Sequence, residues 1–193
     1  MIFTAAPLSS SAFSSASADT ARPPHRQAEP SRRLVAATGL PASGRADAAD
    51  RQFGAPKANT DWQALVAEPD VEAVSVTAPN FLHREIGIAV VSAGKHLWIE
   101  KPVGLNSSDA LAVARAADAH DVRTAVGFNY RNAPAVAAAR ELIAVGELGE
   151  ITHARFYFLS DYAAHPDGAL SWRFQRDRGG NGVLGDLASH GVD

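Results

Sequence analysis

A Glu-Lys-Pro triplet carries residue types that suit catalysis. Glu100, Lys101 and Pro102 follow a short apolar run that is typical of a buried strand. Ligands of open parallel sheets bind outside the carboxyl ends of the strands, where this triplet would lie. The proline restricts the backbone of Lys101 to extended geometry, so that its ammonium can polarise a substrate hydroxyl while Glu100 holds the ammonium in place. A surface lysine in a loop is the alternative, and a lone tripeptide favours it.

A second group of candidate residues lies in the glycine-rich segment 179–190. Asp186 and His190 are four positions apart, so on a helix they would share one face. A histidine beside a carboxylate can act as a general base near neutral pH, and the aspartate can orient the imidazole. An acidic helix cap beside an exposed histidine is the alternative. Two potential ligands without a third do not make a zinc site, so we predict no metal.

Two further segments follow predicted strands. Residues 77–83 link a strand to a helix N-terminus, where backbone N–H groups can face a bound cofactor, although a simple turn capped by Asn80 has the same pattern. Residues 127–131 end in Arg131, which can clamp a substrate or cofactor oxygen or pair with a surface carboxylate.

Strands and helices alternate along the chain and would position these residues. Strands are predicted at 34–37, 71–76, 95–99 and 122–128. Helices are predicted at 45–53, from a capping box at Thr60, at 81–93 after Asn80, from a cap at Ser107 or Ser108 through Ala119, and at 134–145. This alternation indicates parallel βαβ units with helices on both faces of one sheet. Residues 151–159 break the rhythm and predict a strand of a second, antiparallel sheet.

Composition excludes several classes of protein. The 193 residues suffice for one domain, or for one domain and part of another. The net charge of −3 predicts no attraction to nucleic acid or to an anionic membrane. The absence of cysteine excludes disulfides, thiolate metal sites and a cysteine nucleophile. No apolar run approaches the roughly 20 residues that span a bilayer, so we expect a cytoplasmic protein by elimination.

Taken together, the motifs resemble the Gfo/Idh/MocA family of oxidoreductases. The family pattern has a Pro-Asn…His turn, an Ala-Gly-Lys-His run into Glu-Lys-Pro, a Gly-Phe-x-x-Arg strand end, a Gly-x-x-Gly-x-Ile strand start and a glycine-rich Asp-x-x-x-His segment. These appear here, in that order, at 79–83, 93–102, 127–131, 146–151 and 179–190. The resemblance covers about 34–193, and the common order of five motifs is what carries it.

The resemblance implies an enzyme that uses NAD or NADP to oxidise a hydroxyl of a sugar or cyclic polyol by hydride transfer. The implied fold class is α/β, an incomplete Rossmann-type parallel sheet followed by the start of an α+β antiparallel-sheet domain. The resemblance assigns Lys101 and His190 to proton transfer and Asp186 to their support. We hypothesise that His190 takes the substrate proton while Lys101 stabilises the developing oxyanion. The cofactor contacts that it implies are Pro79, Asn80, His83, Glu100, Lys101, Pro102, Asn129, Arg131, Trp172 and Arg173, and the full-length family form is expected to be a homo-oligomer.

The sequence departs from the family pattern at both ends. No glycine precedes Gly39, so the Gly-x-Gly-x-x-Gly phosphate loop has no counterpart. The strand before that loop is central, and residues 1–4 are too short to replace it, so the sheet should separate along its middle. Gly39 stands where the family pattern has an acidic residue that binds the cofactor's ribose. This fits a preference for NADP, and it fits equally a sequence that is disrupted where residues 1–32 meet the family-like part. The chain also stops three residues after His190.

These departures predict three regions and leave three functional interpretations. Residues 1–32 form a disordered or non-family segment, with a transit peptide as the alternative. Residues 33–131 form a partial NAD(P)-binding domain, and 132–193 begin a truncated substrate domain. We expect turnover to be lost or impaired in this chain. The alternative is a non-catalytic remnant that binds a partner or a small sugar, and a chain that borrows its missing parts from another is a third option.

Overall fold

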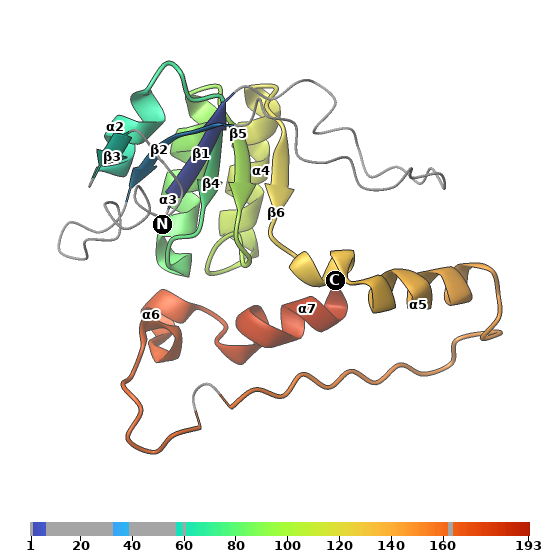
Figure 1. Ribbon diagram of the computed structural model, residues 1–193. Coiled ribbons are helices and arrows are strands. Elements are labelled where there is room, and N and C mark those ends of the chain that lie inside the picture. The colour runs from blue at the N-terminus through green and yellow to red at the C-terminus, as the bar shows by residue number, and fades with distance from the viewer. Residues whose placement is uncertain (1, 7–32, 39–56, 60, 162–163) are drawn as a thin grey trace.

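The strands of the computed structural model form one six-stranded sheet (Figure 1). The structure describes residues 2–6, 33–38, 57–59, 61–161 and 164–193. The strands are β1 (Ile2–Ala6), β2 (Arg33–Thr38), β3 (Lys57–Asn59), β4 (Ala73–Val76), β5 (His96–Ile99) and β6 (Thr124–Val126), in the order β3-β2-β1-β4-β5-β6. β4, β5 and β6 run parallel to one another, as β2 and β3 do. The α/β class and the predicted strands at 34–37, 71–76, 95–99 and 122–128 are therefore confirmed, although several strands are shorter than expected.

β1 fills the middle of the sheet, so the prediction that the sheet separates there is wrong. It pairs antiparallel with β2 on one side and with β4 on the other. Ile2 lies opposite Val76, and Ala5 lies opposite Ala73. A strand of only five residues is sufficient because its neighbours are also short, and it pairs the backbone groups that both would otherwise expose.

The helices lie close to the positions that were predicted from the sequence. They are α2 (Trp62–Ala67), α3 (Asn80–Ser92), α4 (Ser107–Ala119), α5 (Pro134–Ala144), α6 (Arg176–Gly179) and α7 (Ser189–Val192). The 3₁₀ turns η1 (Asn129–Asn132) and η2 (Trp172–Phe174) and the π-helical turn η3 (Leu184–Ala188) complete the set. The predicted helices at 81–93 and 134–145 are confirmed to within about one residue, and the helix predicted to end at Ala119 does so. The predicted helix at 45–53 lies outside the described residues.

Two helix caps differ from the predictions. Asp61, not Thr60, caps α2. Asn106, not Ser107 or Ser108, caps α4. In both cases the cap has extended backbone geometry and its side chain accepts a backbone N–H two or three positions further on, which is what a cap requires. The sequence offered several adjacent capping residue types, and backbone geometry selects among them.

The ends of α3 show which residues set its length. Asn80 is not a cap, because Pro79 occupies the N-cap position and Asn80 is the first helical residue, buried in the structure. Gly94 follows the helix with φ +71°, a left-handed conformation that favours glycine. Gly146 has φ +79° after α5. In each of these helices the C-cap residue is followed by a glycine in the left-handed conformation.

The described core lies where β4 and β5 meet the helices. Alternate residues of each strand are buried, as a sheet face in contact with helices requires. Gly87 of α3 allows close approach to α4, because a Cβ there would lie 3.3 Å from the Val113 methyl groups. The buried cluster comprises Leu65, Val66, Val71, Val74, Val76, Ile86, Val90, Val91, Leu97, Ile99, Val113 and Ala117. This core holds the carboxyl ends of β4 and β5 in fixed positions.

Residues 151–159 form no strand, which corrects that prediction. The segment runs as extended chain past α7 (Figure 1). A strand needs a neighbour that takes up its backbone N–H and C=O groups, and no strand of the described residues pairs with it. The antiparallel sheet of a second domain is therefore not seen in the described part of the chain.

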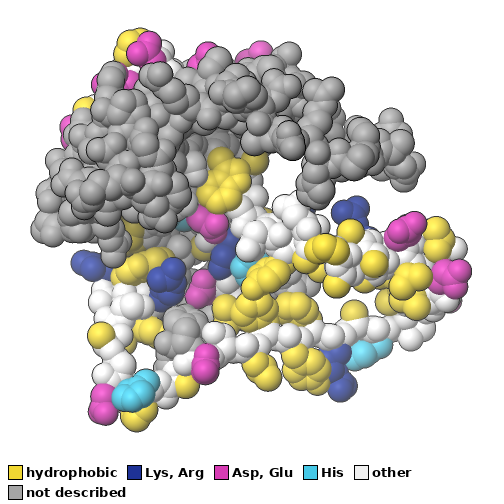
Figure 2. All heavy atoms as spheres, in the orientation of Figure 1, with side chains coloured by type: hydrophobic (Ala, Val, Ile, Leu, Met, Phe, Trp, Pro, Cys, Tyr) yellow, Lys and Arg dark blue, Asp and Glu magenta, His cyan; other side chains and the backbone are white. Residues whose placement is uncertain are grey.

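Apolar side chains are exposed over the C-terminal part of the molecule (Figure 2). α5 has no buried residue, and Leu159 and Val192 are each 89% exposed. Within the described residues, no helix has both the length and the apolar character to cross a membrane.

Candidate active site

The ammonium of Lys101, at the carboxyl end of β5, binds Asp186. Lys101 Nζ donates to Asp186 Oδ1 at 2.9 Å and also to the Asp186 backbone carbonyl. The side chains are 11% and 25% exposed, so water screens the pair weakly. The contact joins residues 85 positions apart and attaches the glycine-rich segment to the carboxyl edge of the sheet.

Glu100 holds the backbone and not the ammonium of Lys101, which corrects that prediction. Glu100 Oε2 accepts the backbone N–H of Lys101 at 3.1 Å. Gly127, at the end of β6, allows this arrangement, because a Cβ there would lie 2.8 Å from Glu100 Oε1 and 2.9 Å from the Trp98 ring. The carboxylate therefore fixes the turn from which the Lys101 side chain extends.

His83, on α3, joins two loops at the same edge. Its Nδ1 lies 2.6 Å from the Pro102 carbonyl oxygen and its Nε2 lies 2.7 Å from the Ala78 carbonyl oxygen. The residue is 1% exposed. Burial lowers the pKa of His83, whereas the two carbonyls and the charge of Glu100 act in the opposite direction. Both ring nitrogens lie against the backbone, so His83 braces the loops after β4 and β5.

His190, on α7, lies among aromatic rings. The Tyr130 ring meets it edge-on with centroids 4.7 Å apart, Phe158 stacks at 6.0 Å, and Phe128 lies edge-on at 6.0 Å. His190 Nδ1 is buried and has no hydrogen-bond partner among the described residues. Burial, followed by the positive charge of Lys101, lowers the pKa of His190. The ring is therefore neutral near pH 7 and can accept a proton.

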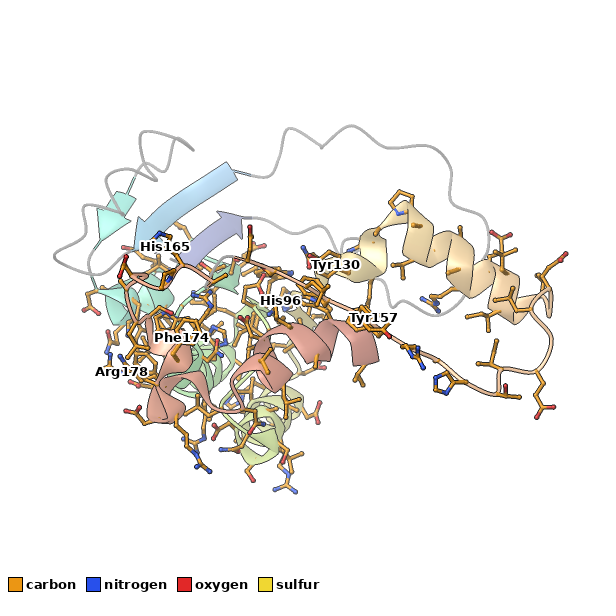
Figure 3. All side chains as sticks on the ribbon, turned by 90° about the horizontal axis from the view of Figure 1, so that it is seen from below. His96, Tyr130, Tyr157, His165, Phe174 and Arg178 are labelled. Atoms are coloured by element: carbon orange, nitrogen blue, oxygen red, sulfur yellow. The ribbon has the colours of Figure 1, made fainter. Side chains whose placement is uncertain are left out.

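Tyr130 and Phe158 are contributions to the site that the sequence motifs did not reveal. Tyr130 lies within the 127–131 motif, where only its polar neighbours were singled out. Phe158 belongs to the aromatic run that was interpreted as a strand. Tyr130 and the extended chain that carries Tyr157 both lie beside α7 (Figure 3). The signal available in the sequence was the clustering of aromatic residues.

Asp186 binds Lys101, whereas the predicted contact with the His190 imidazole is not made at Nδ1. Asp186 lies in the π-helical turn η3, and α7 begins only at Ser189. A π-helical turn is wider than an α-helical one, so residues four apart no longer lie directly above one another. The Asp186 carboxylate binds Lys101, and its Oδ2 lies 3.8 Å from Arg173 Nε. His190 Nδ1 therefore donates no hydrogen bond to this carboxylate.

The remaining predicted residues lie around this centre. Arg131 is 61% exposed at its side chain and forms a bidentate pair with the Asp193 carboxylate, which is 10% exposed, with N···O distances of 2.6 and 2.5 Å. The Arg173 guanidinium lies 4.5 Å from the centroid of the Trp172 ring. Asn129 is exposed in η1, and Pro79 precedes α3 at the carboxyl edge of β4. No group of three or more potential metal ligands occurs within the described ranges.

The site fits the nicotinamide end of a dinucleotide better than its pyrophosphate end. Ligands of parallel sheets bind at the carboxyl edge, where Lys101 supplies a cation and His190 a buried nitrogen without a partner. The pyrophosphate end normally lies on a glycine-rich loop after the central strand. Here the central strand β1 runs the other way and ends at Ala6, beside the start of β2. β1 therefore does not lead into a loop at this edge.

The arrangement defines a Rossmann-type α/β protein with a charged centre at the carboxyl edge of its sheet. The family model described as the oxidoreductase family with the NAD-binding Rossmann fold matches residues 16–128, and that of the GFO/IDH/MocA C-terminal domain matches residues 136–193. The chain belongs to the Gfo/Idh/MocA oxidoreductase family. The predicted family is thus confirmed, and NAD(P) is the cofactor class of that family.

Several similar proteins act on sugars or inositols according to their names. Levoglucosan dehydrogenase of Pseudarthrobacter phenanthrenivorans is 41% identical over 75% of this chain and 37% of its own length. The 1,5-anhydro-D-fructose reductase of Ensifer adhaerens is 37% identical over 72% of this chain and 41% of its own length. A structure of levoglucosan dehydrogenase with NADH and levoglucosan has a TM-score of 0.70 at 36% identity, covering 79% of this chain and 41% of that one. The chain thus spans about two fifths of the length of these relatives.

Proposed function

We propose that this chain carries the reaction site of an NAD(P)-dependent oxidoreductase that acts on a hydroxyl group of a sugar or cyclic polyol. The observation that carries the proposal is the joint placement of Lys101, Asp186 and His190 at one edge of the sheet. The names of the relatives support the substrate class, since they include levoglucosan, 1,5-anhydro-D-fructose and scyllo-inositol enzymes.

His190 acts as the general base in this proposal. Its lowered pKa keeps the ring neutral near pH 7, and a neutral imidazole can take the proton of a substrate hydroxyl. The rings of Tyr130 and Phe158 restrict the orientation of the imidazole and exclude water around it.

Lys101 stabilises the negative charge that develops on the substrate oxygen as its proton leaves. Its ammonium is mostly buried, so its field is screened less than that of a surface lysine. Asp186 holds the ammonium in place, and Glu100 fixes the backbone from which the side chain extends. A nicotinamide ring, when bound, supplies the acceptor for the hydride from the hydroxyl-bearing carbon.

The proposal is tested by turnover and by ligand binding in the full 193-residue chain. The variants are Lys101→Met and His190→Gln, with Arg140→Ala on the exposed face of α5 as a control. Substrates are levoglucosan and scyllo-inositol, each with NAD and NADP. Loss of turnover by at least about 100-fold in both variants, with Arg140→Ala unchanged, supports the assigned roles. Turnover that survives Lys101→Met would remove the lysine from the mechanism.

A second function, sugar binding without turnover, is favoured by the direction of β1. The reversed strand removes the usual support for the cofactor's pyrophosphate and leaves Lys101 and His190 in place. Calorimetric titration with levoglucosan in the absence of any nucleotide separates the two functions. Binding of the sugar by a chain that turns over neither substrate supports the second function, and absence of sugar binding excludes it.

A further inference from the structure

The central strand of the sheet runs in the opposite sense to its neighbours. β1 is antiparallel to β2 and to β4, while β4, β5 and β6 share one direction. Ile2, at the start of β1, lies opposite Val76, the last residue of β4. Ala6, at its end, lies opposite Arg33, the first residue of β2. The chain therefore leaves β1 at the edge of the sheet remote from Lys101.

A dinucleotide gains affinity when its pyrophosphate meets free backbone N–H groups at a helix N-terminus after the central strand. Glycines are needed there because a side chain would keep the phosphates away from the backbone. β1 ends at the wrong edge for this role, and no glycine occurs before Gly39. Within the described part of the chain, the sheet therefore offers no such cradle beside β1.

The other helix N-termini near this edge do not replace the cradle. α3 starts with Pro79 at its N-cap, which lacks an N–H, and with Asn80, which is buried. At the start of α4, the Asp109 N–H is already bonded to the Asn106 side chain at 3.0 Å. The Pro79 cap and the Asn106–Asp109 hydrogen bond therefore leave each turn with fewer free N–H groups than a glycine-rich phosphate loop has.

The geometry points to a chain that binds the nicotinamide mononucleotide half of the cofactor and gains no affinity from the adenosine diphosphate half. This inference rests on the proposed function, because it takes the centre formed by Lys101 and His190 as the nicotinamide site. A cradle of even two hydrogen bonds to charged phosphate oxygens would strengthen binding on the order of 100-fold. The presence or absence of such a cradle is therefore easy to measure.

The experiment compares three probes on the full chain: reduced nicotinamide mononucleotide, NADH and ADP-ribose. Nicotinamide fluorescence gives Kd for the first two, and ADP-ribose is added as a competitor. We expect the two Kd values to agree within about threefold and ADP-ribose to displace neither probe. Lys101→Met should weaken both reduced nucleotides by the same factor. Levoglucosan dehydrogenase of Pseudarthrobacter phenanthrenivorans, measured in parallel, is expected to prefer NADH strongly.

Each outcome decides the inference. NADH binding at least about tenfold tighter than the mononucleotide, or displacement by ADP-ribose, would overturn it and leave the proposed function intact. Equal affinities that do not change in Lys101→Met would place the nucleotides elsewhere and also overturn it. Failure of both reduced nucleotides to bind at millimolar concentration overturns the inference together with the cofactor assignment in the proposed function.

Discussion

Replacing His83 with phenylalanine tests whether this residue braces the loop that carries Lys101. A phenyl ring fills the place of the imidazole and is slightly larger, but it cannot hydrogen-bond to the Pro102 and Ala78 carbonyls, which lie 2.6 and 2.7 Å from the ring nitrogens. A buried acceptor left without its partner costs about 1–3 kcal/mol. The lowered pKa of His83 favours the neutral imidazole, which has one N–H and donates to one of the two carbonyls, so the expected cost is that of one lost hydrogen bond, about 1–3 kcal/mol. The variant should therefore lose a large share of a typical domain's stability, which is about 5–15 kcal/mol.

The assay is urea unfolding followed by tryptophan fluorescence, since Trp98 on β5 lies close to the affected loop. Arg84→Ala is the matched control on the same helix. Arg84 is 55% exposed and lies 3.5 Å from Asp109, so its loss should cost no more than about 1 kcal/mol. A free energy of unfolding for His83→Phe within about 0.5 kcal/mol of the unaltered chain would refute the bracing role of His83.

Three further predictions concern charge and packing. Lys101→Met should raise the pKa of His190, because the positive charge of the lysine helps to lower it. Asp186→Asn should lower this pKa further, because the negative charge of the aspartate raises it. An NMR titration of the His190 ring that shows no shift, or shifts in the opposite directions, would contradict these electrostatic assignments. Burial lowers the pKa of Lys95 from 10.5, so the unfolded chain binds more protons just below that pH, and stability should rise as pH increases towards 10.5. Lys95→Met should remove this slope in urea titrations at several pH values, and an unchanged slope would assign it to other groups. Gly127→Ala should cost about 1–3 kcal/mol through contacts with the Glu100 carboxylate and a tryptophan ring, and a thermal melt identical to that of the unaltered chain would show that the neighbours yield.

Local pattern predicted the elements of the fold but not their pairing. β4 and β5 could be located because apolar residues and turn residues mark them, and α3 and α5 because a glycine follows each. The role of residues 2–6 could not be predicted, because five residues contain no information on which strands lie beside them or in which direction they run. Residues 151–159 have an apolar pattern that suits a strand, yet they form no strand, because no strand of the described residues pairs with them.

Several residues of the candidate site could also be predicted from local sequence, but not all of their contacts. Lys101, Asp186 and His190 were identified from motifs, and the structure brings Lys101 and Asp186 into contact. The ligand of the lysine was assigned to its sequence neighbour Glu100, whereas the contact is made by a residue 85 positions away. Such a contact depends on how the glycine-rich segment returns to the sheet, which local sequence does not determine.

β5 is a four-residue strand with a lysine just beyond each end, and the two amines have different environments. Lys95 is 8% exposed, and its amine donates hydrogen bonds to the carbonyls of Glu68 and Val71. These bonds connect the start of β5 to the chain segment before β4. Lys101 holds Asp186 beside the proposed reaction centre. These two are the only lysines after residue 57. Acylation of amines, mapped by mass spectrometry, therefore separates two events in one short segment: Lys95 becomes reactive when the fold opens, and Lys101 when the contact with Asp186 is released.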